Sequence, residues 1–292
     1  MTQKKIVIGI GEILWDVFDS QKILGGAPAN FAYHAARAGA EGIAVSAVGN
    51  DELGDEIVRT LRKENLPAIL QRCEKATGTV RVSLDSAGVA DYCFSPDVAW
   101  DNLVFTDELR SLAQSGAAAA FGTLARRAPR SRETIRAFLD AMPETALRVC
   151  DINLRRNFYS EELLRESAQL ADILKVNESE LAVLGKFFLK DEPQITPAKS
   201  EPFFRKMFGE FPRLKYIVLT CGADGSLIET RNGERSFVPA DKTIPVVDTV
   251  GAGDAFIATF TVEILNGKTL REAHLRSAKR ADFVCSRSGA MC

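Results

Sequence analysis

An aspartate at position 254 follows glycines at 251 and 253, just before an apolar helical pattern. Residues 243–247 predict the end of a strand and residues 254–265 a buried helix, so residues 251–254 should form the first turn of that helix. The free backbone N–H groups and the dipole of such a turn favour a phosphate. The stretch therefore predicts a phosphoryl-transfer site; the alternative is a helix whose dipole the aspartate merely complements.

A second glycine-rich stretch, residues 25–30, precedes another helical pattern at 31–38. Pro28 suits the start of that helix. The amide of Asn30 and the carboxylate of Asp16, in the preceding segment, could bind the hydroxyl groups of a sugar. The alternative is a turn that only packs a helix close to a strand.

Apolar strand-like segments alternate with helical patterns along most of the chain, which predicts an α/β fold with a doubly wound, mostly parallel sheet. The predicted strands are residues 6–10, 42–48, 117–121, 147–150, 173–176 and 216–220. Polar loops follow several of them, at 122–123, 151–156 and 177–180. Because ligands bind at the carboxyl ends of parallel strands, these loops should meet at one binding edge.

A hairpin at residues 79–94 alternates apolar and polar residues, unlike the core strands. We interpret it as part of a β-sheet lid, formed from about 12–24 and 76–104 and inserted in a single α/β domain that spans 1–292. Phe94, on the apolar face of the hairpin, either presses on a substrate or packs the lid.

Composition limits the partners. A net charge of −2, without a Lys/Arg block, argues against nucleic acid. No segment has the length of a membrane span and the first residues do not resemble a signal peptide, so a cytoplasmic location is expected. The six scattered cysteines and two histidines argue against a zinc site. The proline-rich segment 187–203 is interpreted as a surface insertion without a site.

Two common nucleotide-binding fingerprints are missing: the chain has neither GxGxxG nor GxxxxGK[ST]. A phosphate would therefore be held by the backbone of residues 251–254, without the lysine of a P-loop. An aspartate with a pKa near 3.9 is a weak base at neutral pH. In a loose phosphoryl-transfer transition state, however, orientation of the hydroxyl matters more than base strength, so Asp254 can act even without a raised pKa.

Three motifs together resemble the ribokinase-like (PfkB) carbohydrate kinases. They are GGAPAN at 25–30, NESE at 177–180 and DTVGAGD at 248–254, in the family's order and spacing. Gly11-Glu12 and Asp16, which precede the first motif, make the chain similar to fructokinases in particular. The resemblance implies a sugar kinase that uses ATP and Mg²⁺. Its substrate would be a small-molecule sugar, with fructose as the leading candidate.

The resemblance also implies roles for individual residues. Asp254 matches the catalytic base, Gly251, Ala252 and Gly253 the anion hole, and Arg155 a contact to the phosphates. The sugar side would consist of Asp16, Gly25, Gly26 and Asn30, with Phe94 in the lid. Asn177 and Glu180 match the element that supports Mg²⁺ through water, although Glu180 alone could be a solvated carboxylate in a helix's first turn.

Further implied sites lie towards the C-terminus. Thr220, Gly222 and Gly225 resemble a nucleotide-binding turn, and Asp248, Val250 and Gly289 border a monovalent-cation site, commonly K⁺, in the family. A homodimer through the lid is also expected. Two other functions remain open: a nucleoside or other ribose-type kinase of the same fold, and a non-catalytic module that senses a sugar or nucleotide.

Overall fold

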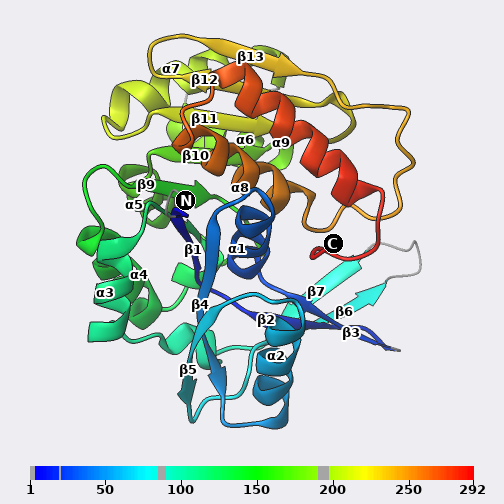
Figure 1. The fold of residues 1–292 in the computed structure, drawn as a ribbon. Coiled ribbons are helices and arrows are strands. Elements are labelled where there is room, and N and C mark those ends of the chain that lie inside the picture. The colour runs from blue at the N-terminus through cyan, green and yellow to red at the C-terminus, as the bar shows by residue number, and fades with distance from the viewer. Residues whose placement is uncertain (1–3, 20, 85–89, 190–196) are drawn as a thin grey trace.

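The computed structural model describes residues 4–19, 21–84, 90–189 and 197–292. Within these ranges, nine strands form a large sheet in the order β13-β12-β11-β10-β9-β8-β1-β4-β5 (Figure 1). The strands are β1 (Ile6–Ile10), β4 (Glu41–Gly49), β5 (Ala68–Cys73), β8 (Ala118–Gly122), β9 (Leu147–Asp151), β10 (Ile173–Asn177), β11 (Tyr216–Thr220), β12 (Ser226–Thr230) and β13 (Arg235–Val238).

The order of the strands creates a binding edge. From the central strand β1 the chain adds β4 and β5 on one side, then returns to add β8, β9, β10 and β11 on the other, all in parallel. Loops after β1 and β8 therefore leave the sheet in opposite directions, which opens a crevice at the carboxyl ends of these strands. Only β12 and β13 in this sheet run antiparallel to their neighbours.

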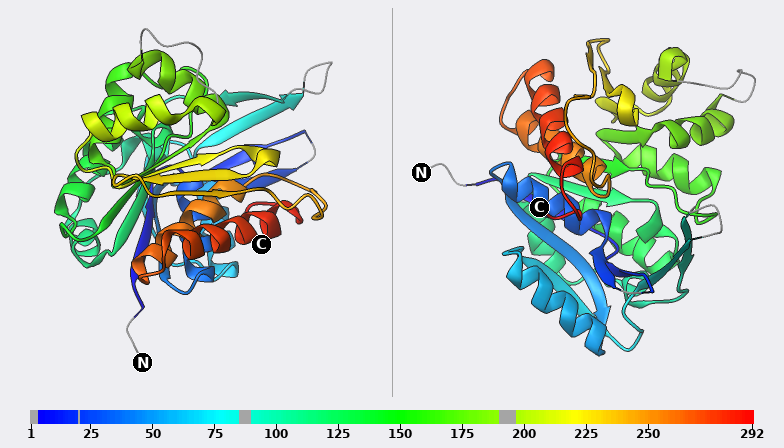
Figure 2. Two further views of the ribbon diagram at one scale, coloured as in Figure 1. Left: turned by 90° about the horizontal axis from the view of Figure 1, so that it is seen from above. Right: turned by 90° about the vertical axis from the view of Figure 1, so that its right-hand side faces the viewer.

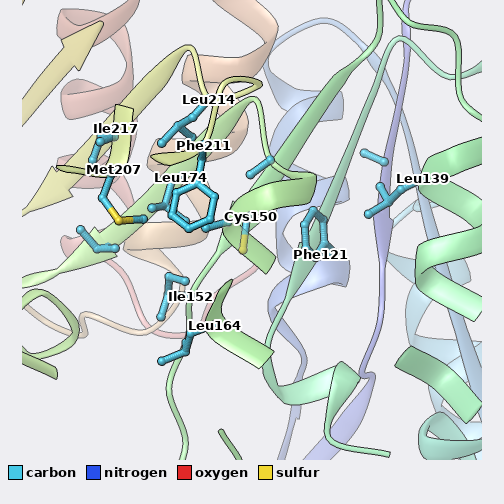
Figure 3. Packing of buried hydrophobic residues seen from close by; sticks show 14 of the residues in the cluster. Phe121, Leu139, Cys150, Ile152, Leu164, Leu174, Met207, Phe211, Leu214 and Ile217 are labelled. Carbon is cyan, nitrogen blue, oxygen red and sulfur yellow. The ribbon is translucent and has the colours of Figure 1, made fainter. Parts of the chain in front are cut away.

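Helices cover both faces of the large sheet. One face carries α1 (Ala27–Arg37), α2 (Glu52–Lys63), α8 (Ala252–Leu265) and α9 (Leu270–Cys285). The other carries α3 (Asp107–Ser115), α4 (Pro129–Ala141), α5 (Glu161–Leu170), α6 (Glu178–Phe188) and α7 (Glu201–Glu210). Figure 3 shows this second core, where the strand side chains Leu174 and Ile217 lie near Met207 and Phe211, and Phe121 lies further along the sheet beyond Cys150. The predicted doubly wound α/β fold is confirmed.

Helix α1 lies unusually close to the sheet, and this fixes the height of Asn30 above the binding edge. A Cβ atom added to Gly9 in β1 would lie 1.8 Å from the carbonyl oxygen of Pro28, and one added to Gly42 in β4 would lie 1.9 Å from that of Ala32. Only glycine allows this approach. The sheet therefore positions the N-terminal turn of α1 directly.

A smaller four-stranded sheet projects from this body in the order β3-β2-β6-β7 (Figure 2). It consists of β3 (Lys22–Gly25), β2 (Leu14–Val17), β6 (Thr79–Leu84) and β7 (Ala90–Phe94). The predicted hairpin supplies β6 and β7, whose turn at 85–88 lies outside the described residues. Strands β2 and β3 were not predicted individually, because four-residue strands carry little periodicity.

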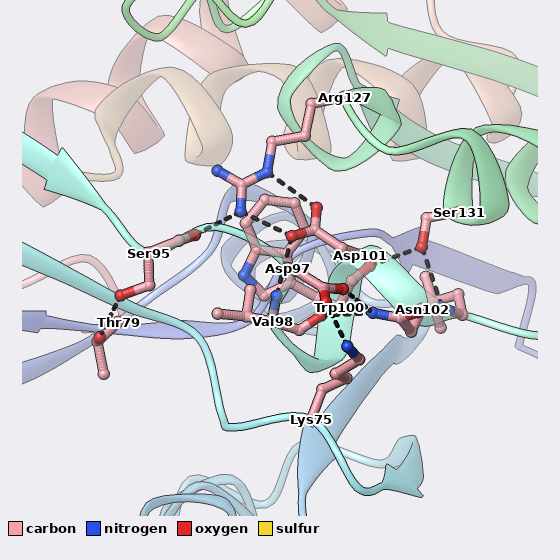
Figure 4. A network of polar contacts seen from close by, with 11 residues as sticks. Lys75, Thr79, Ser95, Asp97, Val98, Trp100, Asp101, Asn102, Arg127 and Ser131 are labelled. Carbon is pink, nitrogen blue, oxygen red and sulfur yellow. Dashed lines mark hydrogen bonds and ion pairs between the residues drawn. The ribbon is translucent and has the colours of Figure 1, made fainter.

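One arginine anchors the base of the small sheet (Figure 4). The Arg127 guanidinium donates to both carboxylate oxygens of Asp101, at 2.8 and 2.7 Å, and to the carbonyl of Ser95 at 2.7 Å. It also stacks on the rings of Trp100, at 4.1 Å, and Phe158, at 4.8 Å. Because Ser95 directly follows β7, this buried cluster ties the small sheet to the body of the protein.

The predicted strand at 243–247 is wrong. The segment is a loop in which Val246 and Val247 are 68% and 62% exposed. The backbone N–H groups of Val247 and Asp248 donate to the carbonyl of Cys285, at 2.8 and 3.2 Å, instead of to a neighbouring strand. The apolar residues therefore border the end of α9. Helix α8 starts at Ala252 with Gly251 as its N-cap, so the predicted first turn at 251–254 is confirmed.

The interpretation of 187–203 as a surface insertion is also wrong at both ends. Phe188, at the end of α6, is buried, and Phe203 and Phe204 in α7 are completely buried in the second core. Residues 190–196 lie outside the described part of the chain. The prolines of the segment suggested a surface loop, so the sequence reading overlooked Phe203 and Phe204, which pack α7 against the sheet.

Candidate active site

A cavity of about 650 Å³ lies at the carboxyl edge of the large sheet, beneath the small sheet. Its wall comes from the loops after β1, β9 and β10, from β2, β3 and β7, and from the first turns of α1 and α8. The structure brings most of the predicted residues to this one cavity: Asp16, Gly25, Gly26, Asn30, Phe94, Arg155, Asn177, Glu180, Val250, Gly251, Gly253 and Asp254. Segments from both ends of the sequence thus meet in one place.

The remaining predicted residues are outside the wall of the cavity. Thr220 ends β11, and Gly222 and Gly225 flank the short turn that follows it on the same sheet edge. Asp248 joins two loops, because its carboxylate oxygens accept from the N–H groups of Val250 and Gly289, each at 3.0 Å. Ala252 is the first residue of α8.

Asp254 lies in the first turn of α8 without capping it. The N-cap, Gly251, has a left-handed φ of 80° and the helix start has no side-chain cap hydrogen bond. The carboxylate instead accepts a hydrogen bond from the Asn30 amide at 2.8 Å. This hydrogen bond joins α8 to α1 beside the cavity. An aspartate that only complemented the helix dipole would not need such a contact.

The pKa of Asp254 is raised from 3.8 to about 7, first by burial and then by the negative charge of Asp151. The hydrogen bond from Asn30 and the charges of Lys175 and Arg155 lower the pKa but do not offset these effects. The sequence argument did not need a raised pKa, and the motif does not reveal one because burial is a tertiary property. A base with a pKa near 7 is well matched to neutral pH.

Sequence reasoning missed one residue at the centre of the site, Lys175. Its Nζ donates to both carboxylate oxygens of Asp151, at 2.9 and 3.0 Å, and both side chains are buried. A Cβ atom added to Gly253 would lie 3.2 Å from this Nζ. The backbone turn at 251–254 therefore has a lysine beside it that comes from strand β10 and not from a P-loop.

Burial alone would lower the pKa of Lys175, but the negative charges of Asp151 and Glu180 outweigh burial and raise it. The side chain is therefore an ammonium ion at all physiological pH values. The sequence does contain a signal for it: Lys175 is a lone lysine near the carboxyl end of the apolar strand β10. A charged residue is unusual in a strand that helices cover on both faces.

Glu180 is buried rather than solvated. Its two carboxylate oxygens accept from the backbone N–H groups of Leu154, at 3.0 Å, and Asn177, at 2.8 Å, while the Asn177 side chain accepts from the N–H of Glu180. Burial raises the pKa of Glu180, and the charge of Lys175 opposes that effect. Each oxygen keeps a second lone pair, which could accept from a water on a metal ion.

The described residues contain no group of three or more Asp, Glu, His or Cys that could enclose a metal ion. This donor set suits Mg²⁺, which keeps several waters and binds mainly to phosphate oxygens, rather than a metal held by the protein alone. Asn177 and Glu180, to which the family resemblance assigns the support of Mg²⁺, both line the cavity.

The small-sheet side of the cavity carries two acidic residues. Gly25 makes room for the Asp16 carboxylate, since a Cβ at position 25 would lie 2.5 Å from its Oδ2. Burial raises the pKa of Asp16 to about 6, partly offset by the charge of Arg155. Glu12 is 1% exposed, and its Oε2 has no hydrogen-bond partner in the described part of the chain. Burial raises its pKa to about 7.

The loop after β9 links the two sides of the cavity. Arg155 and Arg156 both contribute to the wall, and Asn153 and Arg156 have left-handed φ values of 45° and 51°. In the same loop, the Phe158 ring packs edge-on against Phe94 of the small sheet at 5.7 Å. Phe94 therefore packs against the body of the protein and also borders the cavity, while its contact with a substrate stays a prediction.

The sequence profile described as "pfkB family carbohydrate kinase" matches residues 4–292. The chain belongs to this family. The resemblance predicted from the three motifs is thus confirmed, and the cavity is that of a pfkB-family carbohydrate kinase.

Similar proteins agree with this assignment. An uncharacterized sugar kinase of Pyrococcus horikoshii is 30% identical over 284 residues, which cover 91% of this chain and 84% of the relative. A fructokinase of Klebsiella pneumoniae is 31% identical over 242 residues, which cover 80% of this chain and 74% of that enzyme. The P. horikoshii protein has been solved with ATP, and its structure matches 98% of this chain and 94% of its own with a TM-score of 0.79. In the described ranges, no helix is long and apolar enough to cross a bilayer.

Proposed function

We propose that this chain transfers the γ-phosphoryl group of ATP to a hydroxyl group of an unphosphorylated sugar, with fructose as the leading substrate. The observation that supports this most directly is the buried Asp254 carboxylate, hydrogen-bonded to Asn30 at 2.8 Å beside the backbone turn of α8. A base, an anion-binding turn and the acidic residue Asp16 face one cavity.

In the proposed reaction, Asp254 accepts the proton of the attacking hydroxyl group. The hydroxyl oxygen forms a bond to the γ-phosphorus, while the bond from the γ-phosphorus to the oxygen that bridges to the β-phosphate breaks and its electron pair leaves with ADP. The N–H groups of Gly251, Ala252 and Gly253 stabilise the negative charge on the transferred group. The acceptor becomes a sugar phosphate.

ATP is proposed to lie along the sheet edge, over Asn177, Thr220, Gly222 and Gly225, with Arg155 at its phosphates. The P. horikoshii relative solved with ATP supports this choice of nucleotide. When bound to the nucleotide, Mg²⁺ neutralises charge on the β- and γ-phosphates. The role of Glu180 would be to orient waters of that ion, using the lone pairs that its two backbone contacts leave free.

The charge of the small-sheet region favours an uncharged acceptor over a sugar phosphate. Residues 12–25 contain three carboxylates and one cation, and residues 76–97 contain three carboxylates and one cation. A phosphate on the acceptor would meet the net negative charge of these segments, which leaves only the cavity-wall arginines Arg155 and Arg156 to oppose it. The hydroxyl groups of fructose, in contrast, could donate to Asp16 and accept from Asn30. The fructokinase of K. pneumoniae among the relatives also supports fructose.

Three further features are part of the proposal. The segments 12–24 and 76–104 act as a lid inserted in a single domain, 1–292, and two copies pair through their lids. A monovalent cation, most simply K⁺, binds at Asp248, Val250 and Gly289, which hydrogen bonds already hold together. Light scattering and replacement of K⁺ by a large organic cation test the dimer and the ion respectively. The cytoplasmic location stays a prediction.

The test is an ADP-release assay with fructose, ribose, fructose 6-phosphate and a set of nucleosides. We expect turnover with fructose, and a kcat at least about 100-fold lower for Asp254→Asn, with the sugar KM nearly unchanged, because a positioned general base contributes about 10²–10⁴. Glu263→Gln is the matched control, since this carboxylate lies on the same helix but pairs with Arg276 away from the cavity.

Each other outcome contradicts a stated part of the proposal. Turnover with nucleosides alone indicates a nucleoside kinase, and preference for fructose 6-phosphate contradicts the uncharged acceptor. Binding of sugar or ATP without turnover would indicate a sensing module. Near-normal turnover of Asp254→Asn would exclude Asp254 as the base.

A further inference from the structure

Lys175 is a buried cation directly below the backbone turn that starts α8. Its Nζ lies 3.2 Å from the position of a Cβ on Gly253, and its side chain belongs to the wall of the cavity. Because Gly253 has no side chain, nothing at that position separates the ammonium group from a ligand held by the turn. The glycine and the lysine together form a positive floor for the cavity.

The hydrogen bonds of Lys175 leave part of its capacity free. An ammonium group has three N–H donors, and in the described part of the chain its acceptors are the two carboxylate oxygens of Asp151, at 2.9 and 3.0 Å. The third donor has no protein acceptor among those residues. A phosphoryl oxygen at the turn would provide one.

The charges around Lys175 explain why a phosphate needs this cation. The carboxylates of Asp151, Glu180 and Asp254 all act on Lys175 from nearby. A transferred phosphoryl group at the turn would add further negative charge beside them. Arg155, the other cation considered for this position, is exposed at the mouth of the cavity, where solvent screens it more strongly.

We propose that Lys175 is a catalytic residue whose ammonium group stabilises the phosphoryl group during transfer, from beneath Gly253. This role rests on the proposed kinase function. The lysine keeps its proton throughout, since the hydroxyl proton passes to Asp254 and the electron pair of the broken bond leaves with ADP. Lys175 would supply the charge that the lysine of a P-loop supplies elsewhere, from a strand instead of a loop.

The competing explanation is that Lys175 only neutralises the buried Asp151. A double-mutant cycle separates the two roles. Lys175→Met leaves a buried carboxylate unpaired and could fail to fold, so its effect is also measured in the Asp151→Asn background, where no such charge remains. We expect Lys175→Met to lower kcat at least about 100-fold in both backgrounds, as does loss of one preorganised electrostatic contact. A kcat for the double variant within about fivefold of Asp151→Asn alone would overturn the proposal.

Binding of a transition-state mimic gives a second measurement, which would not change if Lys175 had only a structural role. Aluminium fluoride with ADP, Mg²⁺ and sugar mimics the transferred phosphoryl group. In the Asp151→Asn background, we expect Lys175→Met to weaken binding of this complex at least about 100-fold, but ADP alone by less than about threefold. Equal weakening of both would contradict the proposal. Absence of turnover by the wild type with every acceptor would instead reject the proposed function.

Discussion

The two halves of the cavity hold their charges in different ways. At the strand edge, each buried charge already has a partner: Lys175 with Asp151, and Glu180 with two backbone N–H groups. On the small-sheet side, the Oε2 of Glu12 has no hydrogen-bond partner among the described residues, and burial raises the pKa of Asp16. The first half is preorganised, whereas the second contains acceptors that a ligand could satisfy.

This difference suggests that the two halves of the cavity have different roles in the proposed reaction. Preorganised charges favour the transition state, because they need not reorient during the reaction. Acceptors without partners gain most when a substrate brings hydroxyl donors to them. Substitutions at the strand edge should therefore lower kcat, and substitutions on the small-sheet side should mainly raise the KM for the sugar. Three experiments test this comparison.

The largest effect is expected at the anchor of the small sheet. Arg127→Met removes the two hydrogen bonds to the buried Asp101 carboxylate and should lower the free energy of unfolding by about 3–5 kcal/mol, since it leaves a buried charge unpaired. Denaturant unfolding followed by circular dichroism measures it. The control, Arg136→Met, removes an exposed pair with Asp140 and should cost less than about 1 kcal/mol. Equal losses would show that the small sheet does not depend on this arginine.

Asp16 tests the binding role of the small-sheet side. Asp16→Asn keeps the shape of the side chain and removes its charge, so the sugar KM should rise about 10- to 100-fold, as expected for a hydrogen bond to a charged group. The KM for ATP should stay within about twofold. Steady-state kinetics measures both, with the exposed Asp19→Asn as control. A fall in kcat without a change in sugar KM would contradict the division between the halves.

The pH dependence of kcat/KM for the sugar should report the raised pKa of Asp254, about 7. Only the ionised carboxylate can accept the hydroxyl proton, so kcat/KM should fall about tenfold for each pH unit below 7 and level off above it. Glu12, whose pKa is also raised to about 7, is the competing origin of this limb. The limb should persist in Glu12→Gln. A profile that is flat down to pH 5 would show that Asp254 ionises normally.

The sequence predicted those parts of the protein that local patterns encode. Alternating strands and helices gave the doubly wound sheet, and the motifs at 25–30, 177–180 and 248–254 identified segments that do meet in one cavity. These signals are local, because glycine turns, helix starts and apolar strands each depend on a few adjacent residues.

The parts that were missed depend on distant contacts. Lys175 resembles any strand residue until the sheet brings it beside Asp151 and below Gly253. The anchoring role of Arg127 likewise depends on Asp101 and Phe158, which come from other segments. Residues 243–247 have the composition of a strand, but the N–H of Val247 donates to the carbonyl of Cys285 at the end of α9 instead of to a neighbouring strand. Burial and charge pairing are tertiary properties, so the raised pKa of Asp254 was equally hidden.

The anchor of the small sheet also gives the protein an optical probe. The chain has two tryptophans: Trp15 lies in β2 and bonds to the carbonyl of Leu53, and Trp100 stacks against Arg127 at the base of the sheet. Neither indole lines the cavity. Intrinsic fluorescence therefore reports on the small sheet and its base, and stopped-flow fluorescence after addition of sugar and ATP would test whether this sheet moves, without any attached dye.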